Sequence, residues 1–127
     1  MHKRRHLYQS VIYGGATAPL SYTQQVLNLF GSDIISYLTL SDSSGTMAAD
    51  ASGNNRTGTY TNSPTLGAEG IGDGLTSVSF DGTDDLVNWY SASLAAAFNS
   101  AEGTFMQWLK LSNGVWNDGV YRKSAQI

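Results

Sequence analysis

"DASGNNRTGTY", residues 50 to 60, is the turn-forming stretch that decides how this chain folds, because it lies between two segments with the character of strands. Glycine adopts left-handed backbone conformations without steric cost, and short polar side chains accept hydrogen bonds from nearby backbone amides. We therefore predict a tight turn in which Gly53 and Gly58 have positive φ, and in which Asp50, Ser52 and Asn54 bond to neighbouring amides.

The composition favours one β-rich domain. Of the 127 residues, 41% are hydrophobic, which is enough for a core, whereas only 13% are charged and 14 are glycine. Such a balance is typical of β proteins with many turns. No apolar run is long enough to span a membrane, and the first twenty residues lack the sustained apolar segment of a classical signal peptide.

The absence of cysteine excludes disulfides and thiolate metal sites. His2 and His6 are the two histidines, so the body has none for a zinc site or a serine–histidine triad. Lys3, Arg4 and Arg5 make the N-terminal tip basic, while the rest of the chain carries four basic residues against ten acids. A basic tip suits an acidic partner, an anionic surface or nucleic acid, although a solvated end is commoner, and we do not expect nucleic acid here.

The first part of the chain predicts an arm followed by a helix. Residues 1–20 read as an extended basic arm, because glycine and proline interrupt any regular pattern. Residues 21–32 predict a short helix in which Ser21 is the N-cap and Gln24 completes a capping box. Three apolar side chains would form its buried face: Val26, Leu29 and Phe30.

Residues 33–127 predict an all-β sandwich, because short strands alternate with turn clusters and no helix separates each strand from the next. We expect Val78 and Phe80 to face inward and Trp108 to be a core residue. Residues 91–98 are rich in alanine and predict one or two helical turns. Strands are expected at four segments: residues 34–40, 76–82, 84–90 and 103–112.

The order of these signals resembles the laminin-G-like, concanavalin A-like jelly-roll domains of bacterial surface proteins, secreted enzymes and bacteriophage structural proteins. The residues that carry the resemblance are Tyr37, Leu40, Ser44, Gly45, Thr46, Asp50, Ser52, Gly53, Asn54, Gly58, Thr59, Phe80, Asp81, Gly82, Trp108 and Lys110. It covers residues 34–127 and implies an antiparallel jelly-roll β-sandwich.

The chain departs from the family pattern in three places. Leu38 and Thr39 stand where the family has Trp-Pro, and Gln107 stands where a small apolar residue is common. The family sandwich also has many residues after the strand that contains Trp108. We therefore expect an incomplete sandwich, either because the sequence is part of a longer protein or because another subunit supplies the remaining strands.

The resemblance implies two candidate binding sites. Related sandwiches hold calcium near the loop that contains Asp50 and Asn54, and Asp81, Asp84 or Asp85 could approach from the neighbouring loop. Solvated or turn-forming acids are the alternative interpretation. Sugars would stack on exposed aromatic rings with polar groups beside them. The candidate ligand residues are Trp89, Tyr90, Trp116 and Asn117.

Catalysis is not expected. Glucanases with this fold carry paired carboxylates in a Glu-x-Asp-x-x-Glu run, and Glu69 and Glu102 are the only glutamates here. Two functions follow from the sequence. The first is a virion or surface structural protein, homo-oligomeric or attached to neighbouring subunits through residues 1–32. The second is a carbohydrate-binding adhesion module, calcium-dependent or not, of a larger secreted or cell-surface protein.

Overall fold

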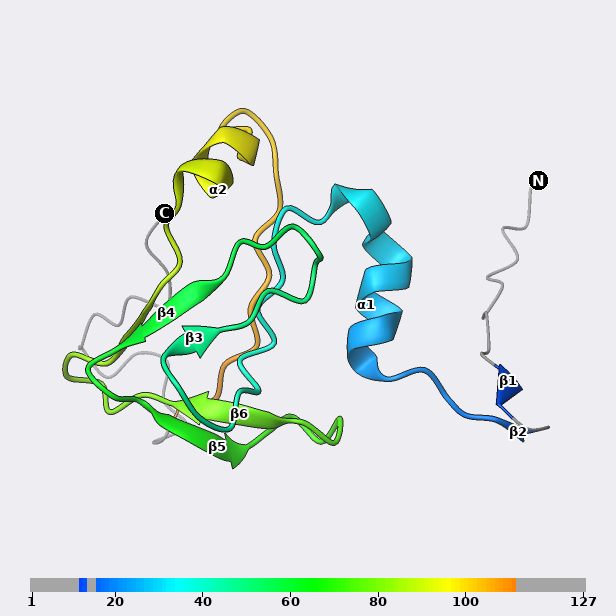
Figure 1. Ribbon diagram of the computed structural model, residues 1–127, viewed down its shortest axis with the longest axis horizontal. Coiled ribbons are helices and arrows are strands. Elements are labelled where there is room, and N and C mark those ends of the chain that lie inside the picture. Colours follow the sequence, from blue (N-terminus) through cyan, green and yellow to red (C-terminus); the bar gives the residue numbers. More distant parts are fainter. Residues whose placement is uncertain (1–11, 14–15, 112–127) are drawn as a thin grey trace.

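A computed structural model describes residues 12–13 and 16–111 of the chain, and this part is mainly β (Figure 1). Three small antiparallel sheets are present among these residues, and their strand orders are β1-β2, β3-β4-β7 and β5-β6. The strands are β1 (Ile12–Tyr13), β2 (Ala16–Thr17), β3 (Met47–Ala48), β4 (Gly58–Thr61), β5 (Thr65–Glu69), β6 (Thr76–Ser79) and β7 (Leu86–Asn88). The helices are α1 (Tyr22–Phe30), the 3-10 turn η1 (Gly31–Asp33) and α2 (Ala92–Ala97).

Helix α1 forms where its capping signals predict it. Ser21 Oγ accepts a hydrogen bond from the Gln24 amide, and the Gln24 side chain accepts one from the Ser21 amide. These two bonds satisfy amides that a helix start otherwise leaves without partners. Gly31 ends the helix at φ 55°, a value that suits a residue without a β-carbon. In Figure 1 the helix lies to one side of the sheets, with β1 and β2 farther out.

The β1-β2 pair modifies the predicted arm. Ile12 pairs with Thr17 and Tyr13 with Ala16, so a short antiparallel ladder replaces an extended course at these residues. Residues 18–20 of the predicted arm form no helix or strand, and residues 1–11 and 14–15 lie outside the described residues.

The sheet β3-β4-β7 is the centre of the fold, with β4 as its middle strand. Along β4, Gly58 and Tyr60 are buried while Thr59 is exposed, so the strand has an inner and an outer face. Tyr60 pairs with Val87 on the inner face, and Thr61 pairs with Leu86 on the outer face. The β5-β6 hairpin follows the Asn62–Ser63 turn and lies below this sheet in Figure 1.

Little of the apolar surface is buried. Among the described residues, the buried hydrophobic side chains are those of Val26, Ala48 and Tyr60. Thirteen large apolar or aromatic side chains remain exposed: Leu29, Phe30, Met47, Ile71, Leu75, Phe80, Leu86, Tyr90, Phe98, Phe105, Met106, Trp108 and Leu109. Far more large apolar side chains of the described residues are exposed than fully buried.

Several expected burials and strands are wrong. Leu29 and Phe30 of α1 are exposed, and so is Phe80, because no described element covers them. Residues 34–40 form no strand but only the isolated bridge between Leu38 and Asp50. Residues 103–111 also form no strand, and Trp108 is 66% exposed instead of being in the core. A strand needs a neighbour for its backbone groups, and side-chain pattern alone does not supply one.

Candidate functional site

The Asp50 turn is held by its carboxylate. Asp50 Oδ1 accepts hydrogen bonds from the amides of Tyr37 at 2.9 Å and Ser52 at 3.0 Å, and Oδ2 accepts one from the Arg56 amide at 2.8 Å. Ser52 Oγ accepts from the Asn54 amide. The predicted turn is therefore confirmed for Asp50 and Ser52, with Gly53 at φ 85°. The prediction for Asn54 is wrong, because its side-chain amide donates to backbone carbonyls instead of accepting from a neighbouring amide. The prediction for Gly58 is wrong, because Gly58 lies in β4 without a positive φ.

The electrostatics of Asp50 follow from these contacts. Burial alone raises the pKa of Asp50, but the hydrogen bonds from Tyr37, Arg56 and Ser52 outweigh it and hold the pKa below its usual value. Both carboxylate oxygens are thus engaged by backbone donors. In this arrangement Asp50 ties the segment at Tyr37 to the turn of residues 50–56.

Asn54 and Arg56 extend this network to other segments. Asn54 Nδ2 donates to the carbonyls of Ile34 and Ile35, which leaves the side chain pointing at the preceding segment. Arg56 Nη1 donates to the same Ile35 carbonyl, and Nε donates to the Ser93 carbonyl of α2 at 3.3 Å. Sequence reasoning missed Arg56, although the one basic residue in a turn that is otherwise polar and contains one acid is a signal that could have pointed to it.

Trp89 is joined to the same network. Its Nε1 donates to Ser36 Oγ and to the Arg56 carbonyl, each at 3.1 Å, and the residue is half-buried. These bonds fix the indole to the Asp50 turn. Tyr90 is different, because its side chain is 78% exposed and open to a ligand. Trp116 and Asn117, the other two candidate ligand residues, lie outside the described residues.

Asp81, Asp84 and Asp85 form an acidic cluster in the loop before β7. One carboxylate oxygen of each lies within 4.8 Å of the others. Asp81 Oδ1 accepts from the Thr83 amide at 2.8 Å, and this bond, assisted by the Asp84 and Asp85 amides, holds the pKa of Asp81 below its usual value. The structure thus brings together the three candidate acids of this loop, Asp81, Asp84 and Asp85. Asp50 belongs to a separate hydrogen-bond network.

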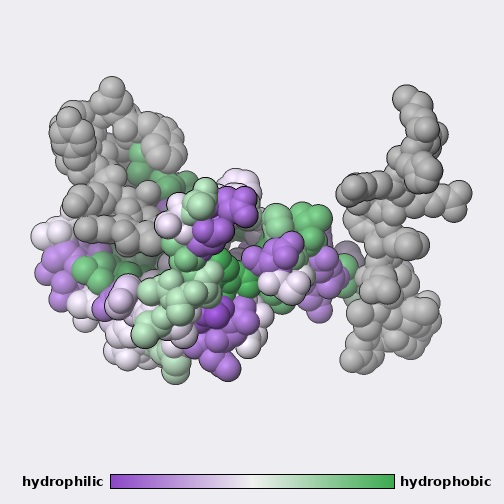
Figure 2. Space-filling model, turned by 90° about the horizontal axis from the view of Figure 1, so that it is seen from above, coloured by the Kyte–Doolittle hydropathy of each residue, from purple (hydrophilic) through white to green (hydrophobic). Residues whose placement is uncertain are grey.

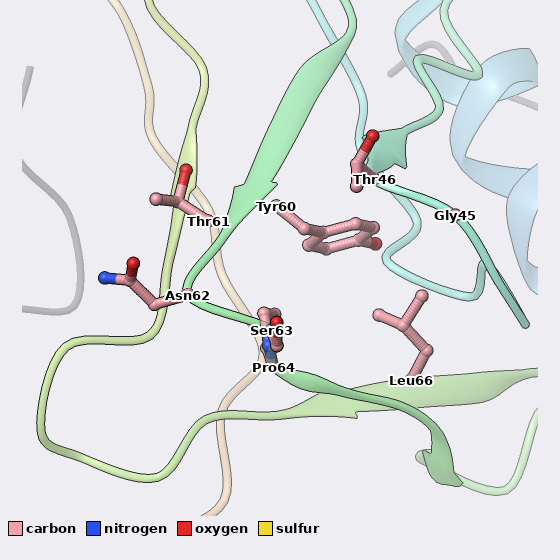
Figure 3. A pocket seen from close by; sticks show the side chains of 8 residues that line it. All are labelled: Gly45, Thr46, Tyr60, Thr61, Asn62, Ser63, Pro64 and Leu66. Atoms are coloured by element: carbon pink, nitrogen blue, oxygen red, sulfur yellow. The ribbon is translucent and has the colours of Figure 1, made fainter.

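A cavity of about 440 Å³ lies between β4 and β5 (Figure 3). In Figure 3 the Tyr60 ring projects into this space, with Leu66 and Thr46 on its far side. Gly45, Thr61, Asn62, Ser63 and Pro64 complete the lining. None of the eight lining residues is charged, so the cavity offers hydroxyl and amide groups and two apolar surfaces but no acid–base pair.

Tyr60 is anchored at the edge of this space. Its hydroxyl donates to Asp42 Oδ2 at 2.8 Å while the residue is only 5% exposed. Burial, together with the hydrogen bond and the negative charge of Asp42, raises the pKa of Tyr60 far above its usual value. The phenol therefore stays protonated at any ordinary pH and acts as a hydrogen-bond donor, not as a base.

The exposed apolar side chains are the remaining feature with functional meaning. Figure 2 shows hydrophobic surface among hydrophilic surface over α1 and elsewhere on the body. On α1 it includes Leu29, which is 70% exposed, and Phe30. On the outer face of β3-β4-β7 it includes Met47 and Leu86. This surface is suited to contact with another protein surface.

Comparison with known proteins gives no relative: no family model, no curated protein and no solved structure matches the chain. Among the described helices, none has the length and apolar character needed to cross a membrane.

Proposed function

We propose that this chain is a non-enzymatic structural protein of a virion or cell surface, with a lectin-like jelly-roll sandwich whose exposed apolar side chains are covered by assembly. The supporting observation is that the described residues form helices and sheets but bury few apolar side chains. Three hydrophobic residues are buried, whereas thirteen large hydrophobic residues are exposed. Assembly would cover this surface, and the arm and helix of residues 1–32 would anchor the chain to a neighbouring subunit. The antiparallel sheets are compatible with a jelly roll.

Helix α1 carries the anchoring part of the proposal. Its N-terminus is closed by a complete capping box, so the helix is well defined although it buries only Val26. Leu29 and Phe30, in its last turn, are left open to a partner. An ordered helix with an uncovered apolar end, preceded by the basic residues Lys3, Arg4 and Arg5, provides both apolar and charged contacts for an acidic neighbouring surface.

The experiment is native mass spectrometry of the full chain, of a chain lacking residues 1–20, and of a Leu29→Ala, Phe30→Ala variant. We expect oligomers from the full chain and a shift of at least several-fold toward monomer in both altered chains, with unchanged circular dichroism in the Leu29→Ala, Phe30→Ala variant. Ile71→Ala is the matched control, because Ile71 is an exposed apolar residue outside residues 1–32. Oligomers that persist in both altered chains would show that this segment is not the anchor.

A calcium-dependent carbohydrate-binding module is the second candidate. The proximity of the Asp81, Asp84 and Asp85 carboxylates and the exposed ring of Tyr90 favour it. Carboxylate oxygens are the ligands that calcium prefers. The same mass spectra, recorded with and without calcium, also test this candidate, since a bound ion adds its own mass to the chain.

A further inference from the structure

We propose that residues 103–111 of one copy of this chain add as an antiparallel strand to the β7 edge of a second copy. The inference rests on the proposed assembly role and names the partner and the mode of contact. Its starting point is a segment that has the sequence of a strand but pairs with no residue that the structure describes. Four of its side chains are exposed: Phe105, Met106, Trp108 and Leu109.

The β7 edge is the most suitable acceptor among the described sheet edges. β7 pairs with β4 on one side only. β3 is a two-residue strand, and β5 carries a bulge at Gly67, whose φ is 75°. The Thr76 hydroxyl of β6 bonds to the Ser41 carbonyl, so another segment already flanks that strand. Short strands, bulges and covering segments are the devices that protect edges. β7 is three residues long, but among the described residues it has no bulge and no strand on its open side.

One antiparallel register matches the two strands. It places Leu109 opposite Leu86, Trp108 opposite Val87 and Gln107 opposite Asn88. Directly beyond these pairs, Lys110 stands opposite Asp85, whose loop also holds the carboxylates of Asp81 and Asp84. Apolar, amide and opposite-charge pairs across neighbouring strands are each favourable.

Other registers fail for a physical reason. A shift by one residue moves Trp108 to the outer face of the sheet. A shift by two residues in one direction places Lys110 opposite Val87, which pairs with the buried Tyr60 on the inner face. A shift by two in the other direction places Trp108 opposite Asp85. Placing a charged side chain opposite an apolar one on the inner face costs free energy, because the charge loses contact with water. The charge of Lys110 therefore favours the register in which it stands opposite Asp85.

The proposed pairing also explains why Trp108 has the sequence context of a core residue and yet is exposed. Opposite Val87, the indole lies on the inner face of the sheet, on the same side as Tyr60. Within its own chain the segment lies beside α1 instead, where Trp108 Nε1 donates to the Tyr22 hydroxyl at 2.8 Å. A second copy can supply the strand that the chain does not provide to its own β7.

The test uses the absence of cysteine from the chain, which makes any introduced thiol unique. Two full-length variants, Asn88→Cys and Gln107→Cys, carry different tags and are mixed under mild oxidation. Directly paired residues meet the Cα separation of about 4.4–6.8 Å that a disulfide requires. We expect the mixed disulfide in several-fold excess over the mixture of Asn88→Cys with Thr104→Cys. In that control the thiols are three residues apart along the strand, about 10 Å.

Two results would overturn the inference. Equal cross-linking in the test and control mixtures would mean that the register is absent. A chain carrying both Asn88→Cys and Gln107→Cys that closes its disulfide as a monomer would mean that the segment pairs with its own β7.

If the arm and α1 variants still dissociate the oligomer while the cross-link is absent, the strand pairing fails and the anchoring role stands. If the cross-link forms and those variants have no effect, the anchoring role fails alone.

Discussion

Asp50 shows how one side chain organises a whole turn. Its two oxygens accept three backbone amides from residues 37, 52 and 56, which are donors on both sides of the turn. Charged acceptors form stronger hydrogen bonds than neutral ones, and the partial burial of Asp50 limits competition from water. The depressed pKa of Asp50 means that the folded state prefers the ionised carboxylate.

We predict that Asp50→Asn lowers the free energy of unfolding by about 2 kcal/mol at pH 7, because an amide replaces a charged acceptor of three bonds. The contribution of Asp50 is fully present above its unfolded pKa of about 3.9 and is lost as the pH falls through the lower, folded value. Urea unfolding at pH 7 and pH 3 measures both effects. The loss of stability between these pH values should be smaller in Asp50→Asn than in the parent chain.

Asp81→Asn is the control for this experiment. Asp81 also accepts backbone amides, but its loop is exposed, so water replaces the lost bonds and the loss of stability should be clearly smaller than for Asp50→Asn. Equal losses from both substitutions would contradict the role assigned to Asp50.

At the scale of elements, the accuracy of sequence-based prediction depended on how local each interaction is. The capping box of α1, the turn around Gly53 and the short helix after Ser91 use bonds between residues close in sequence, and all three form as predicted. Residues 34–40 and 103–111 have strand composition, but their pairing depends on distant neighbours. For the same reason the sequence did not predict the hydrogen bonds of Arg56 and Trp89 or the cavity beside Tyr60. Each of them depends on residues that are separated in the chain.

Gly58 illustrates a requirement that comes from packing between elements. A β-carbon at this position would lie 2.7 Å from Val87 Cγ1 and 3.3 Å from Leu38 Cδ1. Val87 lies in β7, which is paired with β4, and its β-branched side chain has few alternative rotamers, so its methyl group cannot easily give way. The absence of a side chain at Gly58 therefore allows β7 and the segment at Leu38 to approach β4 closely.

We predict that Gly58→Ala destabilises the chain by about 1–3 kcal/mol through this overpacking. Thermal unfolding followed by circular dichroism measures the loss. Gly103→Ala is the matched control, because the nearest atom to its added carbon is the Asn99 carbonyl oxygen at 3.9 Å. If the two variants unfold at the same temperature, close packing at Gly58 is not required.

At the scale of the whole molecule, the proposed association would add to the stability of the chain. The described residues bury few apolar side chains, so the unassembled chain has a small net stability. A partner subunit that binds the folded chain and not the unfolded chain raises the free energy of unfolding by mass action.

We predict that the midpoint of thermal unfolding rises with protein concentration, by about 3 °C for each tenfold increase. Calorimetry over a hundredfold range of concentration measures this dependence. The Leu29→Ala, Phe30→Ala variant should show a smaller dependence than the Ile71→Ala control. A midpoint independent of concentration in the parent chain would mean that its stability does not depend on association.

The order of strands also determines the order of events in folding. The β5-β6 hairpin lies in sequence between β4 and β7, which are neighbours in the central sheet. A hairpin of adjacent strands closes within microseconds, whereas pairing Thr61 with Leu86 requires closure of the whole intervening loop. Early formation of β5-β6 shortens the flexible part of that loop, so the hairpin brings β7 to β4. Because the β5-β6 hairpin lies between β4 and β7 in sequence, the slow long-range pairing of β4 with β7 depends on the fast local pairing of β5 with β6.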